Sequence, residues 1–131
     1  MKKISRGFLV LIFLIESLSA STMLPEQFDS LGPSVKQLLT EKNRVVHFID
    51  DGDFNDFPVV FVGGLGTSVR AIRLLDFLRT MREDLGIRII SIERNGFGQT
   101  EFNSNLTISD DAQDVEEVLN HLKINKFSIF G

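Results

Sequence analysis

Short apolar runs and longer segments of helical periodicity follow one another along the chain. Four runs bounded by turn-forming residues are predicted strands: residues 45–49, 59–62, 87–92 and 126–130. Two segments with apolar positions at three- and four-residue intervals are predicted helices: residues 68–85 and 109–122. Helices of ordinary length between parallel strands indicate an α/β fold with three layers and a mostly parallel sheet.

The apolar positions also predict which surfaces are buried. Residues 59–62 are a continuous apolar run without alternation, which is typical of a strand covered on both faces. The first helix, ended by Gly86, is expected to bury Val69, Ile72, Leu74, Leu75, Phe77, Leu78, Met81 and Leu85. The second helix is expected to bury Ile108, Ala112, Val115, Val118, Leu119 and Leu122. Asp110 and Asp111 at its start suit the helix dipole.

The N-terminal residues differ in kind from the rest of the chain. Lys2, Lys3 and Arg6 precede an apolar run at residues 8–15, and small residues follow. This order is typical of a secretory signal peptide, and the run is too short to span a bilayer. We therefore divide the chain into a signal peptide (1–21), a lead-in with a short helix at 34–41 (22–43), and a partial α/β domain (44–131). The protein is then exported, or cytoplasmic if the first segment is not a signal.

Composition excludes several classes of function. The net charge of −4 and the absence of a Lys/Arg cluster after residue 6 argue against nucleic-acid binding. The chain has no cysteine, which excludes disulfides, thiolate catalysis and cysteine-type zinc sites. Its only histidines are His47 and His121, both expected to be structural or exposed. We predict no metal site and no cofactor, and the oligomeric state stays open.

Three motifs carry a resemblance to a known family. Residues 61–68, with Gly63, Gly64 and Gly66, resemble the loop after the third strand of α/β-hydrolases. Residues 93–100 resemble the loop that follows the fourth strand of that family. Residues 114–131 resemble the helix and strand that lead to its nucleophile elbow. The fold is therefore identified as similar to the N-terminal half of an α/β-hydrolase, over about two-thirds of the chain.

The resemblance has direct consequences for catalysis. Gly131 stands where the elbow G-x-S-x-G begins, and the family's serine, acid and histidine would follow it. As given, the chain is thus expected to be a catalytically incomplete serine-type hydrolase, whose intact parent hydrolyses esters or similar small substrates. The family's oxyanion hole uses a backbone amide that corresponds to Leu65. Gly63 departs from the family pattern, which usually has histidine there.

Other interpretations remain open at this point. Ser68 and Thr67 suit helix caps better than nucleophiles, and the loop at residues 93–98 suits an architectural role. The Gly64–Leu65–Gly66 triplet also resembles a dinucleotide fingerprint, although Val69 occupies its third glycine position. A third possibility is a non-catalytic exported binding module.

Overall fold

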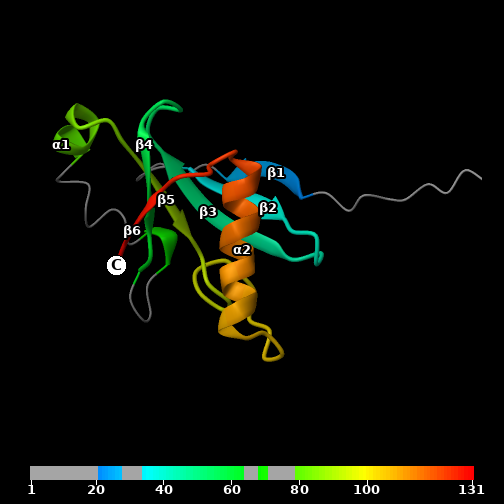
Figure 1. The fold of residues 1–131 in the computed structure, drawn as a ribbon. Coiled ribbons are helices and arrows are strands. Elements are labelled where there is room, and N and C mark those ends of the chain that lie inside the picture. The colour runs from blue at the N-terminus through cyan, green and yellow to red at the C-terminus, as the bar shows by residue number, and fades with distance from the viewer. Residues whose placement is uncertain (1–20, 28–33, 64–67, 71–78) are drawn as a thin grey trace, which may run out of the picture.

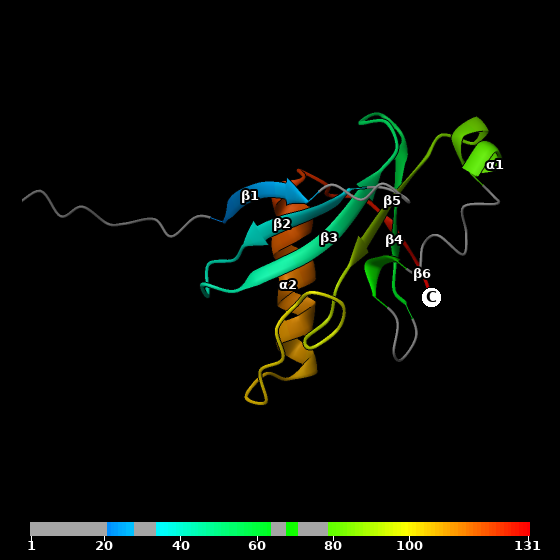
Figure 2. The same ribbon diagram turned by 180° about the vertical axis from the view of Figure 1, so that it is seen from behind.

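The described part of the chain forms one mixed sheet beside two helices. The computed structural model describes residues 21–27, 34–63, 68–70 and 79–131. Within them, six strands stand in the order β1 (Thr22–Gln27), β2 (Val35–Leu39), β3 (Val45–Asp51), β5 (Ile87–Ile92), β4 (Phe57–Phe61) and β6 (Ser128–Phe130). The helices are α1 (Arg79–Asp84) and α2 (Ile108–His121). Figures 1 and 2 show α2 lying across one face of this sheet.

The parallel part of the sheet has the predicted topology. Strand β4 lies between β5 and β6 and runs parallel to both. Helix α2 connects β5 to β6, as a crossover between parallel strands requires. The carboxyl ends of these three strands consequently meet at one edge of the sheet. The fold is a mixed α/β sheet, because β1, β2 and β3 add three antiparallel pairings.

The helix predicted at residues 34–41 is wrong. These residues contain β2, which pairs antiparallel with β3 through a tight hairpin. The hairpin is closed by a bond from the Thr40 amide to the Arg44 carbonyl at 2.8 Å. Val35 and Leu38 are both buried, but they belong to different core clusters. Pairing with β3 satisfies the backbone of this segment and buries side chains on both of its faces, which a surface helix would not do.

Two hydrophobic clusters cover the two faces of the sheet, as the apolar strands predict. Next to α2 lies the larger cluster, built from Leu38, Val46, Phe48, Val60, Ile90, Val118, Leu119 and Ile124. The second cluster contains Val35, Ile49 and Ile89, from strands β2, β3 and β5, together with Val69, which lies outside the strands. Each fully buried aliphatic or aromatic side chain contributes about 1.5–3 kcal/mol. Because successive side chains of a strand point to opposite faces, the sheet carries a hydrophobic layer on each face.

Several predicted core positions are exposed instead. Ile108, at the first turn of α2, is 88% exposed, and Ala112 one turn later is also exposed. On α1, Met81 and Leu85 are 53% and 64% exposed. These positions have the right spacing, but no described element covers them. Ile72, Leu74, Leu75, Phe77 and Leu78 lie outside the described residues.

Candidate functional site

The ends of β4 and β6 bring two of the predicted glycines together. The Val62 amide, one residue beyond the last paired residue of β4, donates to the Phe130 carbonyl at 2.9 Å. Gly131 follows directly, and a Cβ there would lie only 2.9 Å from the Val62 carbonyl oxygen. Gly63 therefore neighbours the place where Gly131 ends the chain. Gly64, Leu65 and Gly66 lie outside the described residues, so the predicted oxyanion amide is not among the described atoms.

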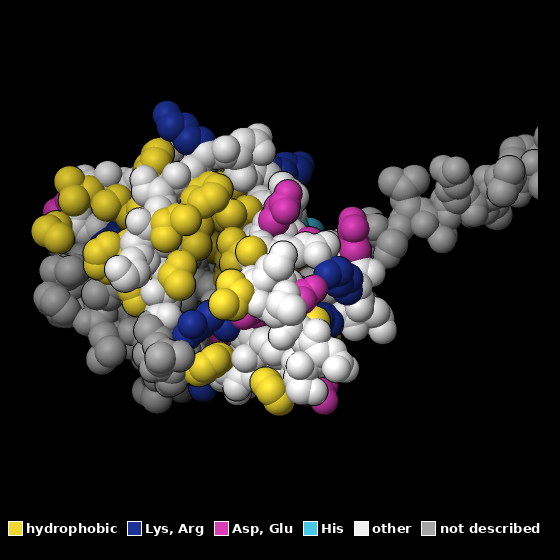
Figure 3. Space-filling model, turned by 60° about the horizontal axis from the view of Figure 1, so that its bottom comes forward, with side chains coloured by type: hydrophobic (Ala, Val, Ile, Leu, Met, Phe, Trp, Pro, Cys, Tyr) yellow, Lys and Arg dark blue, Asp and Glu magenta, His cyan; other side chains and the backbone are white. Residues whose placement is uncertain are grey.

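A hollow opens at this end of the sheet. Its volume is about 350 Å³, and it lies between the ends of β4 and β5 and the first turns of α2. Figure 3, which brings this end of the molecule forward, shows hydrophobic side chains gathered on the surface. The lining includes Val62, Gly63, Ser68, Glu93, Arg94, Ile108, Ala112 and Val115. Open α/β sheets bind their ligands at this end, outside the carboxyl ends of the strands.

The loop after β5 is held by a buried carboxylate. Glu93 accepts hydrogen bonds from the backbone amides of Gln99 (2.8 Å) and Thr100 (3.1 Å). Gly98 has φ +59°, and a Cβ at that position would overlap the Glu93 carboxylate. Only glycine combines this backbone conformation with so close an approach. These bonds give the loop the architectural role that the sequence indicates.

His47 reinforces the same loop. Its backbone carbonyl accepts from the Glu93 amide at 2.8 Å, and its Nδ1 lies 3.1 Å from the Thr100 hydroxyl. Burial lowers the pKa of His47, and the Glu93 carboxylate only partly opposes this effect. A neutral, buried histidine on β3 that bonds a loop is structural, as expected. His121 is exposed at the end of α2, also as expected.

Ser68 and Val69 occupy structural positions next to the hollow. The Ser68 hydroxyl accepts a hydrogen bond from the Arg70 amide at 3.2 Å, which suits the predicted capping role. Val69 is buried in the second core cluster. A dinucleotide fingerprint needs glycine at that position for close packing, so the buried valine argues against that interpretation. Beside them, the Arg94 guanidinium lies 4.7 Å from the centre of the Phe97 ring.

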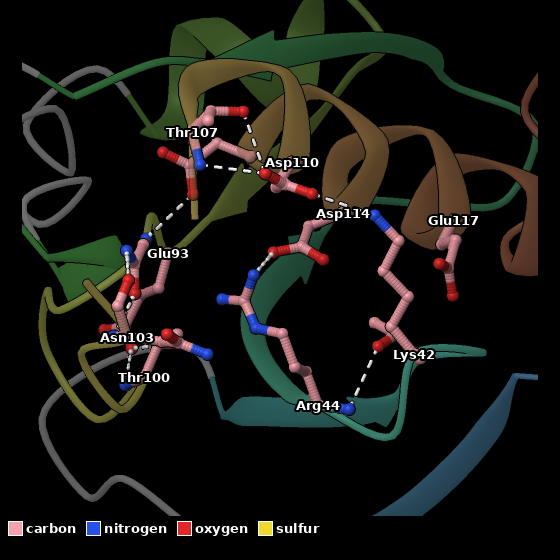
Figure 4. A network of polar contacts seen from close by, with 12 residues as sticks. Lys42, Arg44, Glu93, Thr100, Asn103, Thr107, Asp110, Asp114 and Glu117 are labelled. Atoms are coloured by element: carbon pink, nitrogen blue, oxygen red, sulfur yellow. Dashed lines mark hydrogen bonds and ion pairs between the residues drawn. The ribbon is translucent and has the colours of Figure 1, made fainter. Parts of the chain in front are cut away.

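A polar network that the sequence did not reveal joins α2 to the β2–β3 hairpin. Arg44 Nη1 lies 2.9 Å from the Asp114 carboxylate, and both side chains are largely buried. Burial raises the pKa of Asp114 to about 6, although the Arg44 guanidinium opposes the shift. Lys42 pairs with Asp110 at 2.8 Å on the more exposed side. Figure 4 shows the acidic side chains along one side of the helix, facing the two cations.

Glu117 extends this network by one helical turn. Its carboxylate accepts from the Glu41 amide at 2.8 Å and from the Ser21 hydroxyl at 2.9 Å. The sequence signal was the spacing of Asp110, Asp114 and Glu117, which places three acids on one stripe of a helix. A charged stripe is normally solvated, so the pattern alone does not predict a buried one. Arg44, Asp114 and Glu117 were therefore missed.

Among the residues that the structure describes, no three or more His, Asp or Glu side chains are grouped as a metal site would require. Within the same residues, no helix has the length and apolar character needed to cross a membrane.

Comparison with known proteins identifies the fold. No protein-family model matches the chain, and no curated protein matches it in sequence. Solved structures do match. A hydrolase from Pseudomonas aeruginosa PA01 aligns at a TM-score of 0.63 and 17% identity, covering 72% of this chain and 35% of its own. The esterase EaEST from Exiguobacterium antarcticum aligns at 0.59 and 19%, covering 72% and 34%.

Epoxide hydrolases show the same likeness. Epoxide hydrolase A from Mycobacterium thermoresistibile aligns at a TM-score of 0.62 and 17% identity, covering 75% of this chain and 30% of its own. The chain thus spans about a third of the length of the structures that it matches. Its mixed sheet has the fold of part of an α/β-hydrolase.

Proposed function

We propose that this chain is the N-terminal part of a serine-type α/β-hydrolase that acts on esters or similar small substrates. One observation carries the proposal: Gly131 lies against Val62, where parallel strands β4 and β6 end beside the hollow. A nucleophile elbow that begins at Gly131 would present its serine at this edge. The resemblance of the three sequence motifs and the hydrolase and esterase among the matched structures support the same assignment.

Within this proposal, the loop after β4 supplies one donor of the oxyanion hole. The Leu65 amide has the family's position for that donor, flanked by Gly64 and Gly66. Removing one donor aimed at the developing negative charge typically costs about 2.7–4 kcal/mol of transition-state stabilisation. The second donor would follow the serine. Gly63 and Gly131 lie on the same edge, so both donors would approach one carbonyl oxygen from neighbouring strand ends.

The 131 residues alone do not supply a triad. His47 is buried against the Glu93 loop, and Ser68 caps a turn through its hydroxyl. A serine needs a base within hydrogen-bond reach to act as a nucleophile at neutral pH. On this proposal, the family's order of serine, acid and histidine would place the triad after Gly131. We also propose that residues 1–21 direct the protein to export.

The first test is the coding sequence downstream of Gly131. We expect serine at the second position after Gly131, and an acid and a histidine further on. The extended protein should then react with a fluorophosphonate probe at that serine and hydrolyse an aryl ester. An extended protein that lacks this serine, or that hydrolyses an aryl epoxide but no ester, would contradict the proposal.

A further inference from the structure

Glu117 is a buried carboxylate that is only half satisfied. Its Oε2 atom accepts from the Glu41 amide and from the Ser21 hydroxyl, at 2.8 and 2.9 Å. Its Oε1 atom is buried and has no hydrogen-bond partner within the described residues. Burying a charge without full pairing destabilises the folded state, so a positively charged donor beside this oxygen would stabilise it.

The two neighbouring cations are paired with other carboxylates and do not neutralise Glu117. Arg44 pairs with Asp114, and Lys42 pairs with Asp110. Asp114 precedes Glu117 by one turn of α2, and the two carboxylates repel each other. A compact ammonium group would neutralise Glu117 and could donate up to three hydrogen bonds.

Ser21 is the residue that can bring such a group. Its hydroxyl already touches the Glu117 carboxylate, and its backbone nitrogen belongs to the same short residue. Inside a continuous chain that nitrogen is an uncharged amide. At a chain terminus it is an α-amine, which is mostly protonated at neutral pH because its pKa is about 7.7–8.0. A basic and then apolar segment with the pattern of a secretory signal precedes Ser21.

We propose that the protein is cut between Ala20 and Ser21, and that the new Ser21 ammonium pairs with Glu117. Water, with a signal peptidase as catalyst, hydrolyses the peptide bond. Ala20 leaves as a carboxylate on the released peptide, and the Ser21 amine takes up a proton. This cut lies one residue before the boundary expected from the sequence, and it leaves Ser21 in the mature protein, where its hydroxyl contacts α2. This cleavage rests on the proposed export of the protein and is independent of its catalytic activity.

The direct experiment is to identify the mature N-terminus. The full chain is expressed in a host that secretes it, and the secreted protein is analysed by intact mass and by tandem mass spectrometry of its dimethyl-labelled N-terminal peptide. We expect a free α-amine on Ser21. A secreted protein that begins at Met1, Ala20 or Thr22 would overturn the proposal.

The ion pair is tested on the same secreted protein. A carboxylate partner raises the pKa of an amine, and one unit makes the amine tenfold less reactive below its pKa. At pH 6.5 we expect the Ser21 amine to react with formaldehyde and cyanoborohydride about tenfold more slowly than in Glu117→Gln. Glutamine keeps an acceptor for the Glu41 amide, so the variant retains that bond.

A matched control removes the same charge elsewhere. Glu116 is exposed on α2 next to Glu117, so Glu116→Gln should label at the wild-type rate. A comparison of the wild-type protein in buffer and in 8 M urea needs no variant, and should show the same difference of about tenfold. Equal labelling rates in wild type and Glu117→Gln, or in buffer and urea, would show that the ammonium is unpaired and would overturn the proposal.

Discussion

Replacing Arg44 by methionine should destabilise the fold strongly, and should do so less at acidic pH. Arg44 Nη1 lies 2.9 Å from Asp114, and their side chains are only 14% and 6% exposed. Methionine fills similar space without charge, so the variant leaves the Asp114 carboxylate buried and unpaired. Breaking a buried pair in this way costs about 3–5 kcal/mol, against a total stability of about 5–15 kcal/mol for a domain.

The direction of the pH dependence follows from the Asp114 pKa of about 6. A carboxyl group whose folded pKa exceeds its unfolded value of 3.8 stabilises the fold fully below pH 3.8. That contribution is lost as the pH rises through about 6, because the buried group must then ionise. Without Arg44, the pKa should rise further. At pH 5 Asp114 is protonated in most molecules of either protein, so the loss in Arg44→Met should shrink to about 1 kcal/mol.

The assay is urea unfolding followed by circular dichroism, at pH 5 and pH 7.5 and at low protein concentration. The control is Lys42→Met, which removes a cation from the same hairpin. The Lys42 side chain is 47% exposed, so its pair with Asp110 should be worth no more than about 1 kcal/mol at either pH. A loss of stability in Arg44→Met that is no larger than in Lys42→Met at pH 7.5, or that is larger at pH 5 than at pH 7.5, would contradict this prediction.

Three further predictions concern the site and the open edge. The 131-residue chain should not hydrolyse an aryl ester; turnover that disappears in Ser68→Ala would move the nucleophile into the glycine loop. Gly98→Ala should destabilise the chain by about 1–3 kcal/mol in urea unfolding, because its Cβ would collide with Glu93. Gly86→Ala is the comparison, because Gly86 has a similar φ of +62° and its Cβ would meet only the Asp56 carboxylate, at 3.3 Å. A loss for Gly98→Ala no larger than that for Gly86→Ala would contradict the collision. Ile129 is 69% exposed on edge strand β6, so Ile129→Lys should reduce self-association in analytical ultracentrifugation, and equal association of both proteins would refute this.

The sequence predicts the parallel part of the fold because its strands are unambiguous. Strands β4 and β5 carry apolar residues on both faces and are followed by glycine-containing turns. Their short length and these turns both indicate a strand and not a helix. β2 shows the opposite case. Val35, Leu38 and Leu39 have the three- and four-residue spacing of a helix, and a five-residue segment fits either structure. The pairing with β3 decides between them, and a local pattern does not contain it.

The candidate site, like the fold, could be predicted from the sequence only in part. Gly63 and Gly131 could be expected at one edge, since the carboxyl ends of parallel strands must meet there. The tie between Arg44 and Asp114 could not be expected, because 70 residues separate them and each looks like an ordinary surface charge. Their burial depends on how the hairpin packs against the helix, which is a tertiary property.

Along two rows of side chains on α2, burial is the opposite of what hydrophobicity predicts. Ile108 and Ala112 are apolar and exposed, whereas Asp114 and Glu117 are charged and buried. The charged row is covered by the β2–β3 hairpin, which belongs to the described sheet. The apolar row borders the hollow at the carboxyl ends of the strands. Under the proposed function, this row would line the ligand site, and the buried acids would hold the β2–β3 hairpin against α2 behind it.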